Sequence, residues 1–158
     1  MLTPSVDKGD IIAQKKCHID DTTTSIRLLQ KMNDLAYEAF KEFIEDLLNG
    51  KITVTKQSSD RRSEFHFSKD KPNNGYIDLN WDMSKISAFL RAYDYGITAS
   101  PFGIPRISVE GCEYTWKKYK IDNNVQSEKR MDMQGDKIVF SDKCTRIVLS
   151  GLKQVSDL

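Results

Sequence analysis

The sequence predicts an α+β protein in which a strand and a long helix are followed by a short helix and a small antiparallel β-domain. Three observations lead to this prediction. Apolar residues recur at three- and four-residue spacing over residues 26–48, and again over 86–93. After residue 96, glycines, prolines and short alternating runs replace the helical spacing. The 158 residues suffice for one domain with a buried core, or for one lobe of a larger enzyme with a small appendage.

The first expected element is a turn followed by a strand over residues 6–19. Gly9 interrupts the pattern, and Ile11, Ile12 and Ala13 then form an apolar run.

A long helix is expected next, over residues 23–48. Its N-cap candidates, whose side-chain oxygens can accept the first free N–H groups, are Asp20, Asp21, Thr22 and Thr23. The apolar stripe consists of Ile26, Leu29, Met32, Ala36, Ala39, Phe40, Phe43, Leu47 and Leu48. Asn49-Gly50 is the expected end, because glycine tolerates the left-handed backbone found after helices. Packing in the core is the favoured interpretation of the stripe, and binding to a partner helix is the alternative.

The middle of the chain is expected to be irregular. Ile52 and Val54 fit a short strand or an extended segment, and the polar, turn-rich residues 58–75 fit a surface loop or a linker. This loop holds Arg61, Arg62, Phe65, Phe67, Lys69 and Lys71. Such a cluster could contact a phosphate-bearing substrate, but a solvated loop with two anchoring aromatics is the favoured interpretation.

The second helix is expected over residues 84–94, capped by Asp82 or Ser84 and ended by Gly96. Its apolar face consists of Ile86, Phe89, Leu90 and Tyr93. Four short strands are expected after it, over residues 107–109, 113–121, 137–140 and 146–149. Turns are expected at Gly111, Asn123-Asn124, Gly135-Asp136 and Asp142-Lys143.

Composition excludes several classes of protein. With 39% hydrophobic and 30% charged residues, the chain has the balance of a folded globular protein. A net charge of +1 gives no general attraction to nucleic acid or to anionic membranes. The start of the chain resembles no signal peptide and no run could span a bilayer, so a cytoplasmic location is expected. The cysteines (Cys17, Cys112, Cys144) and histidines (His18, His66) form no disulfide framework or zinc motif, so no metal is expected.

Two blocks of sequence resemble a known family. The run VDKGDIIAQKKCHIDDTTTSIRLL, residues 6–29, is similar to the segment of folate-dependent formyltransferases that joins the catalytic lobe to its last long helix. The run GYIDLNWDMSKISAFLRAYDYG, residues 75–96, resembles the start of that family's C-terminal domain. Either block is weak evidence alone, but their order and spacing around a long amphipathic helix make the match more specific. The family includes methionyl-tRNA formyltransferases, sugar N-formyltransferases and assembly-line formylation domains, and residues 91–111 look most like the last of these.

The resemblance implies three segments. Residues 1–57 would be the end of the catalytic domain, residues 58–75 a polar loop or linker, and residues 76–158 the C-terminal domain. In the family that domain carries a β-region resembling an oligonucleotide-binding barrel, so part of such a barrel is expected here.

The resemblance also implies a chemistry, namely transfer of a formyl group from 10-formyltetrahydrofolate to an amine. The family's asparagine, histidine and aspartate do this, and only the aspartate has a counterpart, Asp7. Asp7 is the candidate catalytic residue and, with Gly9, the candidate for contact with the cofactor; a plain turn residue is the alternative for Asp7. The N-x-H-x-S-x-L-P run that holds the other two groups is missing. On an extended chain His18 would lie more than about 30 Å from Asp7, too far to replace the histidine.

Two hypotheses about function follow. In the first, the chain is the C-terminal part of a formyltransferase, does not bind folate alone, and acts only with an N-terminal half. In the second, it is a non-catalytic module that holds an acceptor substrate or a partner protein. Expected partners are that N-terminal half or a second copy of the chain, and the acceptor amine stays unknown.

Overall fold

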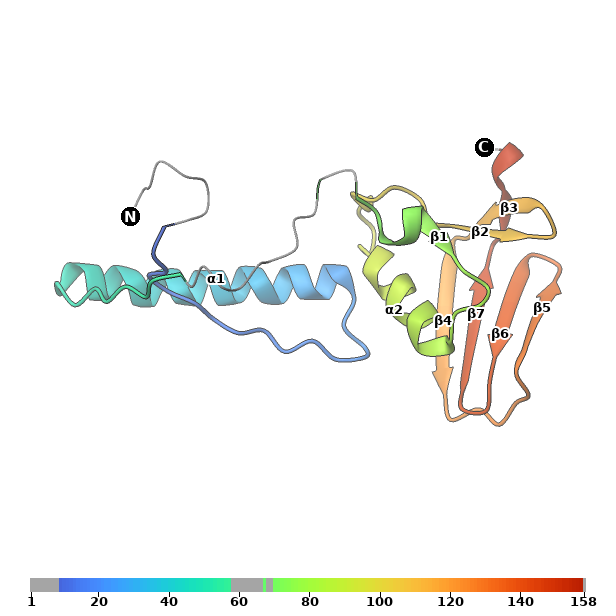
Figure 1. The fold of residues 1–158 in the computed structure, drawn as a ribbon, viewed down its shortest axis with the longest axis horizontal. Coiled ribbons are helices and arrows are strands. Elements are labelled where there is room, and N and C mark those ends of the chain that lie inside the picture. The colour runs from blue at the N-terminus through green and yellow to red at the C-terminus, as the bar shows by residue number, and fades with distance from the viewer. Residues whose placement is uncertain (1–8, 58–66, 68–69, 158) are drawn as a thin grey trace. The chain divides into compact units, whose positions relative to one another are not determined.

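The computed structural model describes residues 9–57, 67 and 70–157. The chain divides into two compact units, residues 1–66 and 67–158, which we consider separately. The described part of the first unit contains helix α1 (Ser25–Leu48). The second unit holds a helix and eight strands, so the α+β class is confirmed (Figure 1). The predicted boundaries at residues 57 and 75 stay predictions. Within the described ranges, no helix is both long and apolar enough to cross a membrane.

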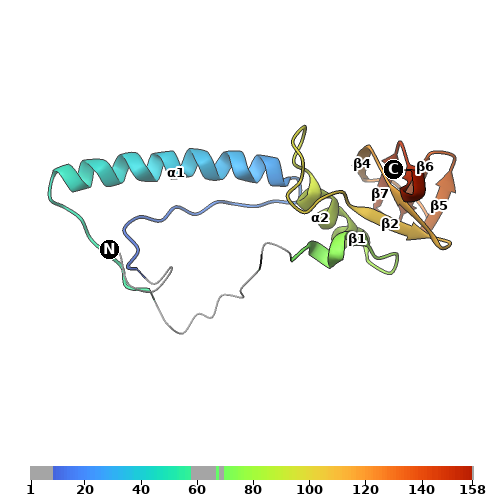
Figure 2. The ribbon, with the colours of Figure 1, turned by 90° about the horizontal axis from the view of Figure 1, so that it is seen from above.

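Helix α1 has well-defined ends (Figure 2). Thr24 is its N-cap, with the side-chain oxygen accepting a hydrogen bond from the Arg27 N–H at 3.5 Å. The predicted N-cap was therefore wrong, because the observed cap lies one residue after the last of the four candidates. At the other end Asn49 is the C-cap, and Gly50 has a φ of 66° as predicted. The N–H groups of Gly50 and Lys51 donate to the carbonyls of Leu47 and Asp46 at 3.2 and 2.8 Å, the bonds of a Schellman motif.

The apolar stripe of α1 is not packed in a core. No residue of the helix is buried; Met32, Phe40 and Leu48 are 53%, 58% and 81% exposed. The predicted core packing is thus wrong for this chain. The physical reason is that the first unit supplies no sheet or second helix, among its described residues, for the stripe to cover.

The strand predicted after the turn at Gly9, ending near residue 19, is also wrong. From residue 9 onward the backbone forms a single antiparallel bridge, in which Ile11 and Thr55 exchange hydrogen bonds of 2.8 and 2.9 Å. Residues 13–20 run on with no regular structure. A strand needs a neighbour to pair its backbone groups, and among the described residues Thr55 is the one that pairs with this segment. Near Thr55, the exposed residues Ile52 and Val54 lie outside any strand. Of the two predicted possibilities, a short strand or an extended segment, the short strand is therefore not formed.

In the second unit, helix α2 (Met83–Tyr93) confirms its predicted apolar face. Asp82 is the N-cap and accepts a hydrogen bond from the Lys85 N–H at 2.7 Å. The buried residues of the helix are Met83, Ile86, Phe89, Leu90 and Tyr93. The helix ends at Tyr93, one residue before the predicted end at residue 94.

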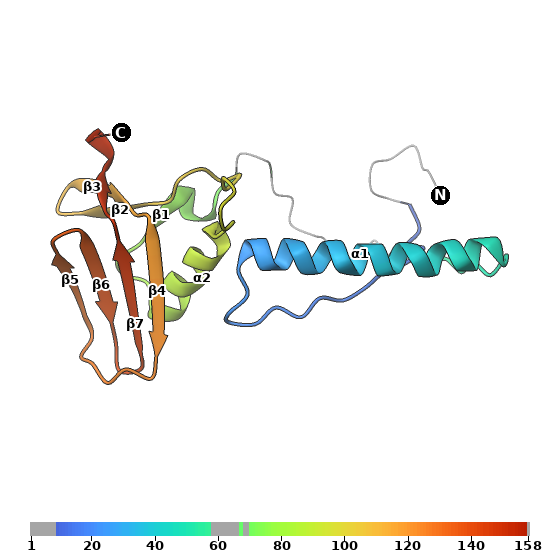
Figure 3. The same cartoon turned by 180° about the vertical axis from the view of Figure 1, so that it is seen from behind.

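Two four-stranded sheets complete the second unit (Figures 1 and 3). The first has the order β1-β2-β3-β8, with strands Tyr76–Ile77, Arg106–Val109, Cys112–Thr115 and Lys153–Gln154. Its β1–β2 pair is parallel and its other pairs are antiparallel. The second is wholly antiparallel, in the order β4-β7-β6-β5, with strands Lys118–Asn123, Thr145–Ser150, Lys137–Ser141 and Arg130–Gln134. Short 3-10 turns occupy Pro72–Gly75 and Val155–Asp157.

The predicted strands match the observed ones except in one place. The stretch 113–121 is two strands and not one, because the chain leaves the first sheet at Trp116 and enters the second at Lys118. Strands β1, β5 and β8 were not predicted. All four predicted turns occur between strands, with positive φ at Gly111, Asn124 and Gly135.

The core of the second unit lies between α2 and the inner faces of the sheets. Its most buried members, all at most 2% exposed, are Ile86, Leu90, Ile107, Ile138, Ile147 and Leu149. Four aromatic rings pack in a row, two of them on α2, with successive centroids 5.6, 4.7 and 5.6 Å apart; they are Trp81, Phe89, Tyr93 and Phe102. This unit therefore closes a core of its own.

Candidate functional site

The predicted catalytic residue, Asp7, lies outside the described residues, so its role stays a prediction. Its neighbour Gly9 is half-buried, and its carbonyl accepts a hydrogen bond from Gln57 Nε2 at 2.6 Å. With the bridge between Ile11 and Thr55, this bond ties the segment next to Asp7 to the segment after α1. The backbone beside the candidate residue is therefore held by contacts 48 residues apart in sequence.

A tight turn built on Asp20 precedes α1. The Asp20 carboxylate accepts hydrogen bonds from the N–H and hydroxyl of Thr22, at 2.8 and 2.7 Å, and from the hydroxyl of Thr23, at 2.9 Å. In return, the Asp20 N–H donates to the Thr23 hydroxyl at 3.2 Å. These bonds stabilise the ionised form of Asp20 and hold its pKa well below the usual range. The bonds from Thr22 have the largest effect. Asp20 therefore stabilises the turn before the helix, and Thr24 is the N-cap.

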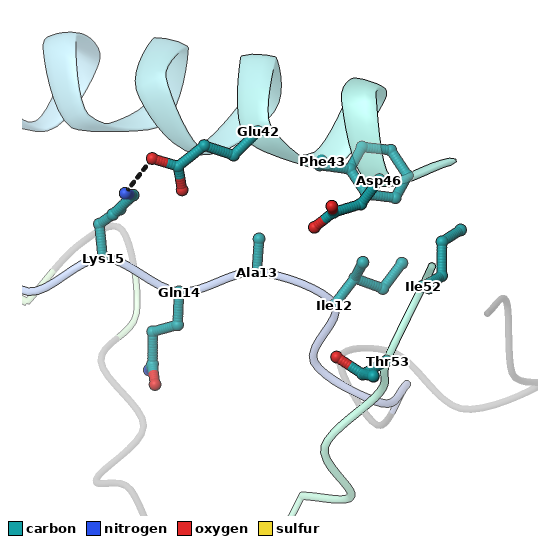
Figure 4. A pocket seen from close by; sticks show the side chains of 9 residues that line it. All are labelled: Ile12, Ala13, Gln14, Lys15, Glu42, Phe43, Asp46, Ile52 and Thr53. Carbon is teal, nitrogen blue, oxygen red and sulfur yellow. Dashed lines mark hydrogen bonds and ion pairs between the residues drawn. The ribbon is translucent and has the colours of Figure 1, made fainter. Parts of the chain in front are cut away.

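A hollow of about 210 Å³ lies between α1 and the segment after Ile11 (Figure 4). Glu42 and Asp46 enter it from the helix, and Lys15 bonds Glu42 at 2.6 Å across one end. These residues do not fit folate. The hollow is smaller than the roughly 300–1,000 Å³ of typical ligand sites, and its carboxylates would repel the glutamate of the cofactor.

The other sequence-predicted positions are described only in part. Arg61, Arg62, Phe65, His66 and Lys69 lie outside the described residues. Of the same loop, Phe67 is 67% exposed. The side chain of His18 is exposed, and in the described part of the chain no group of three or more His, Cys, Asp or Glu could hold a metal ion.

A largely apolar hollow of the second unit was not predicted. It holds about 400 Å³ between the start of α2 and the strands β5 and β6. The alternation of Met131 and Met133 between charged residues could have indicated strand β5, which forms one wall.

Comparisons with known proteins bear on these features. The chain is 33% identical over 97 residues to a methionyl-tRNA formyltransferase of Pseudoalteromonas translucida (strain TAC 125), covering 59% of this chain and 28% of that protein. It is 28% identical over 123 residues to a methionyl-tRNA formyltransferase of Mycoplasma capricolum subsp. capricolum, covering 77% of this chain and 36% of that protein. No family model matches the sequence.

Solved structures of N-formyltransferases share the fold. One is the Helicobacter canadensis enzyme in complex with folinic acid and dTDP-3-aminofucose, with a TM-score of 0.63 and 17% identity over 94% of this chain and 52% of that one. Another is WlaRD, a sugar 3N-formyltransferase solved in the presence of dTDP and 5-N-formyl-THF, with a TM-score of 0.63 and 18% identity over 99% of this chain and 53% of that one.

The proteins named above, which this chain matches in sequence or in fold, are all formyltransferases. The predicted resemblance to the folate-dependent formyltransferase family is confirmed, and the chain corresponds to its C-terminal portion. The chain spans about a quarter to a third of the length of the curated relatives that it matches.

Proposed function

We propose that this chain is the C-terminal part of an enzyme that transfers a formyl group from 10-formyltetrahydrofolate to an amine, and that it acts only together with a folate-binding N-terminal half. The methionyl-tRNA formyltransferases among its relatives support the reaction, and the folates present with the two similar enzymes support the donor. We also propose a cytoplasmic location, and that the β-region after α2 corresponds to part of an oligonucleotide-binding-like barrel.

The observation that carries this proposal is the exposed face of α1. A helix of 24 residues with its apolar residues on one stripe is built to cover another layer of structure, yet none of its residues is buried. A sheet in the N-terminal half would fit this face. Burial of even a few hundred Å² would then contribute several kcal/mol, at roughly 25 cal/mol per Å².

Asp7 has a defined role in this proposal. Formyl transfer needs an amine to attack the formyl carbon, stabilisation of the oxyanion that forms, and removal of a proton from the amine. An ionised Asp7 carboxylate would orient a histidine supplied by the N-terminal half and favour its charged form. The hollow beside α1 does not fit the folate, so in this proposal the N-terminal half also binds the donor.

The experiment begins with the coding sequence immediately upstream, read in all frames for an N-x-H-x-S-x-L-P run. If the run is found, the encoded half and this chain are purified separately and together, and formyl transfer to amines is measured with 10-formyltetrahydrofolate. We expect turnover only from the mixture, and a loss of about a hundredfold or more in Asp7→Asn. Steady turnover by this chain alone, lost in Asp7→Asn, would contradict the proposed division of labour.

A non-catalytic binding module is the second candidate function. The closed core of the second unit favours it, since residues 67–158 bury their own apolar face without help. Lack of any N-x-H-x-S-x-L-P run upstream, together with binding of an acceptor or a protein by the chain alone, would make this the better interpretation.

A further inference from the structure

The hollow of about 400 Å³ in the second unit combines apolar walls with two cations. Its floor is formed by the buried side chains of Met83, Ile86 and Phe140, which are at most 8% exposed. Leu79 and Met131 form the rim and are 43% and 40% exposed. Exposed apolar surface around a hollow of ligand size is what an apolar group of a small molecule would cover.

Two carboxylates and two cations line this hollow, and they differ in the partners of their side chains. Asp82 and Asp142 also line it, but their carboxylates accept backbone hydrogen bonds, from Lys85 at 2.7 Å and from Cys144 and Thr145 at 2.9 and 2.7 Å. Lys129 and Arg130 also line the hollow and are exposed, and neither has an ion-pair or hydrogen-bond partner for its side chain in the described part of the chain. The two cations are therefore available to an anion, whereas both carboxylates are engaged.

We propose that this hollow binds a small amphipathic anion, with its apolar group over Leu79, Trp81 and Met131 and its anionic group between Lys129 and Arg130. The proposal rests on the second unit alone and does not depend on the formyltransferase function. Carboxylate and phosphate share the chemistry that the two cations would recognise, and a planar guanidinium such as that of Arg130 can bind either with two parallel hydrogen bonds.

The indole of Trp81 makes the proposal measurable. It lies in the wall of the hollow, with Lys85 Nζ 4.7 Å from its ring centroid. The chain has one other tryptophan, Trp116, which does not line this hollow. In protein labelled with 5-fluorotryptophan, the two ¹⁹F resonances can be assigned with Trp116→Phe, so that Trp81 reports the site and Trp116 serves as the control.

The full chain is titrated at low ionic strength with octanoate, octyl phosphate and octylammonium, which share an alkyl chain and differ in the charged group. We expect octanoate or octyl phosphate to shift the Trp81 resonance to saturation, and octylammonium to bind at least about tenfold more weakly, because its ammonium group cannot pair with Lys129 or Arg130. The stronger of the two anions identifies the preferred headgroup.

A double variant tests the cations directly. Lys129→Gln with Arg130→Gln is expected to weaken binding of the anion about tenfold, and added salt should reduce this difference. Lys118→Gln with Lys137→Gln removes the same charge at exposed positions outside the hollow and should leave the affinity unchanged. Equal binding of all three ligands, equal effects of the two double variants, or no saturable shift of Trp81 would each overturn the proposal.

Discussion

At the scale of single residues, Asp82 and Ser84 both stand where a cap of α2 could lie, and the structure selects Asp82. Its carboxylate accepts the Lys85 N–H at 2.7 Å, while Ser84 lies exposed within the first turn. A cap oxygen satisfies a donor that the helix itself leaves unpaired. Stability at this end of the helix therefore depends on one side chain.

We expect Asp82→Ala to lower the free energy of unfolding of the second unit by about 1 kcal/mol, because the first-turn N–H loses its partner. Ser84→Ala is the matched control and should change it by less than about 0.5 kcal/mol. Urea denaturation followed by tryptophan fluorescence measures both, since Trp81 and Trp116 lie in this unit. Equal effects of the two changes would show that the bond from Lys85 contributes nothing.

The turn before α1 predicts a dependence on pH. The pKa of Asp20 is lowered in the folded chain, so its contribution to stability is present above the unfolded value near 3.9 and is lost as the pH falls through the lower folded value. A ¹³C titration of the Asp20 carboxyl should give a midpoint below 3.9. Thr22→Val should raise that midpoint by removing one donor. A midpoint at or above 3.9 in the unsubstituted chain would contradict the observed bonds.

At the scale of elements, the two helices have similar amphipathic patterns and opposite environments. Helix α2 buries Met83, Ile86 and Leu90 under the sheets, whereas α1 buries nothing. Amphipathic spacing indicates which side of a helix is apolar, but it does not show whether another element of the same chain packs against that side.

The difference leads to a prediction about matched leucines. Leu90→Ala should destabilise the second unit by about 2–5 kcal/mol, because it opens a cavity at a position 2% exposed. Leu29→Ala, at a position 45% exposed, should cost less than about 0.5 kcal/mol. Urea denaturation followed by circular dichroism tests both. A large loss from Leu29→Ala would mean that α1 packs against something in the isolated chain.

Much of the fold could be predicted because its signals are local. The spacing of apolar residues gave the two helices nearly to their ends, and glycine or asparagine marked the turns between strands. The split of residues 113–121 into β3 and β4 could not be predicted in this way, because Trp116 and Lys117 carry no turn signal. Pairing partners far away in sequence decide where one strand stops and the next begins.

The candidate site was less predictable than the fold. Asp7 and Gly9 were proposed from family resemblance, and only Gly9 is described. The role of Asp20 in its turn depends on the positions of Thr22 and Thr23 in space, which spacing alone does not fix. The cations of the apolar hollow come from Lys129 and Arg130 and the indole from Trp81, and sequence patterns do not bring together positions so far apart.

At the scale of the whole molecule, the exposed stripe of α1 should drive association. Exposed apolar area of a few hundred Å² is worth several kcal/mol when it is buried between molecules. We expect the isolated chain to form dimers or larger species whose population rises with concentration, measured by sedimentation velocity. It should also bind a hydrophobic dye.

Substitutions on α1 provide the control. Met32→Gln with Phe40→Gln should shift the population toward monomer, because both side chains are more than half exposed on the stripe. Gln30→Ala with Asn33→Ala alters two exposed polar positions on the same helix and should not. A chain that stays monomeric at all concentrations and binds no dye would favour the independent binding module.

The strand order β4-β7-β6-β5 has a consequence for the rate at which the second unit folds. Strands β5, β6 and β7 are consecutive and joined by short turns, so they can pair with little loss of chain entropy. Strand β4 must instead close a loop of about twenty residues to reach β7, and it brings the first sheet with it through Trp116 and Lys117. The β5–β6–β7 meander should therefore form before the transition state and β4 after it. Ile138→Val should then slow folding, whereas Ile121→Val should mainly speed unfolding.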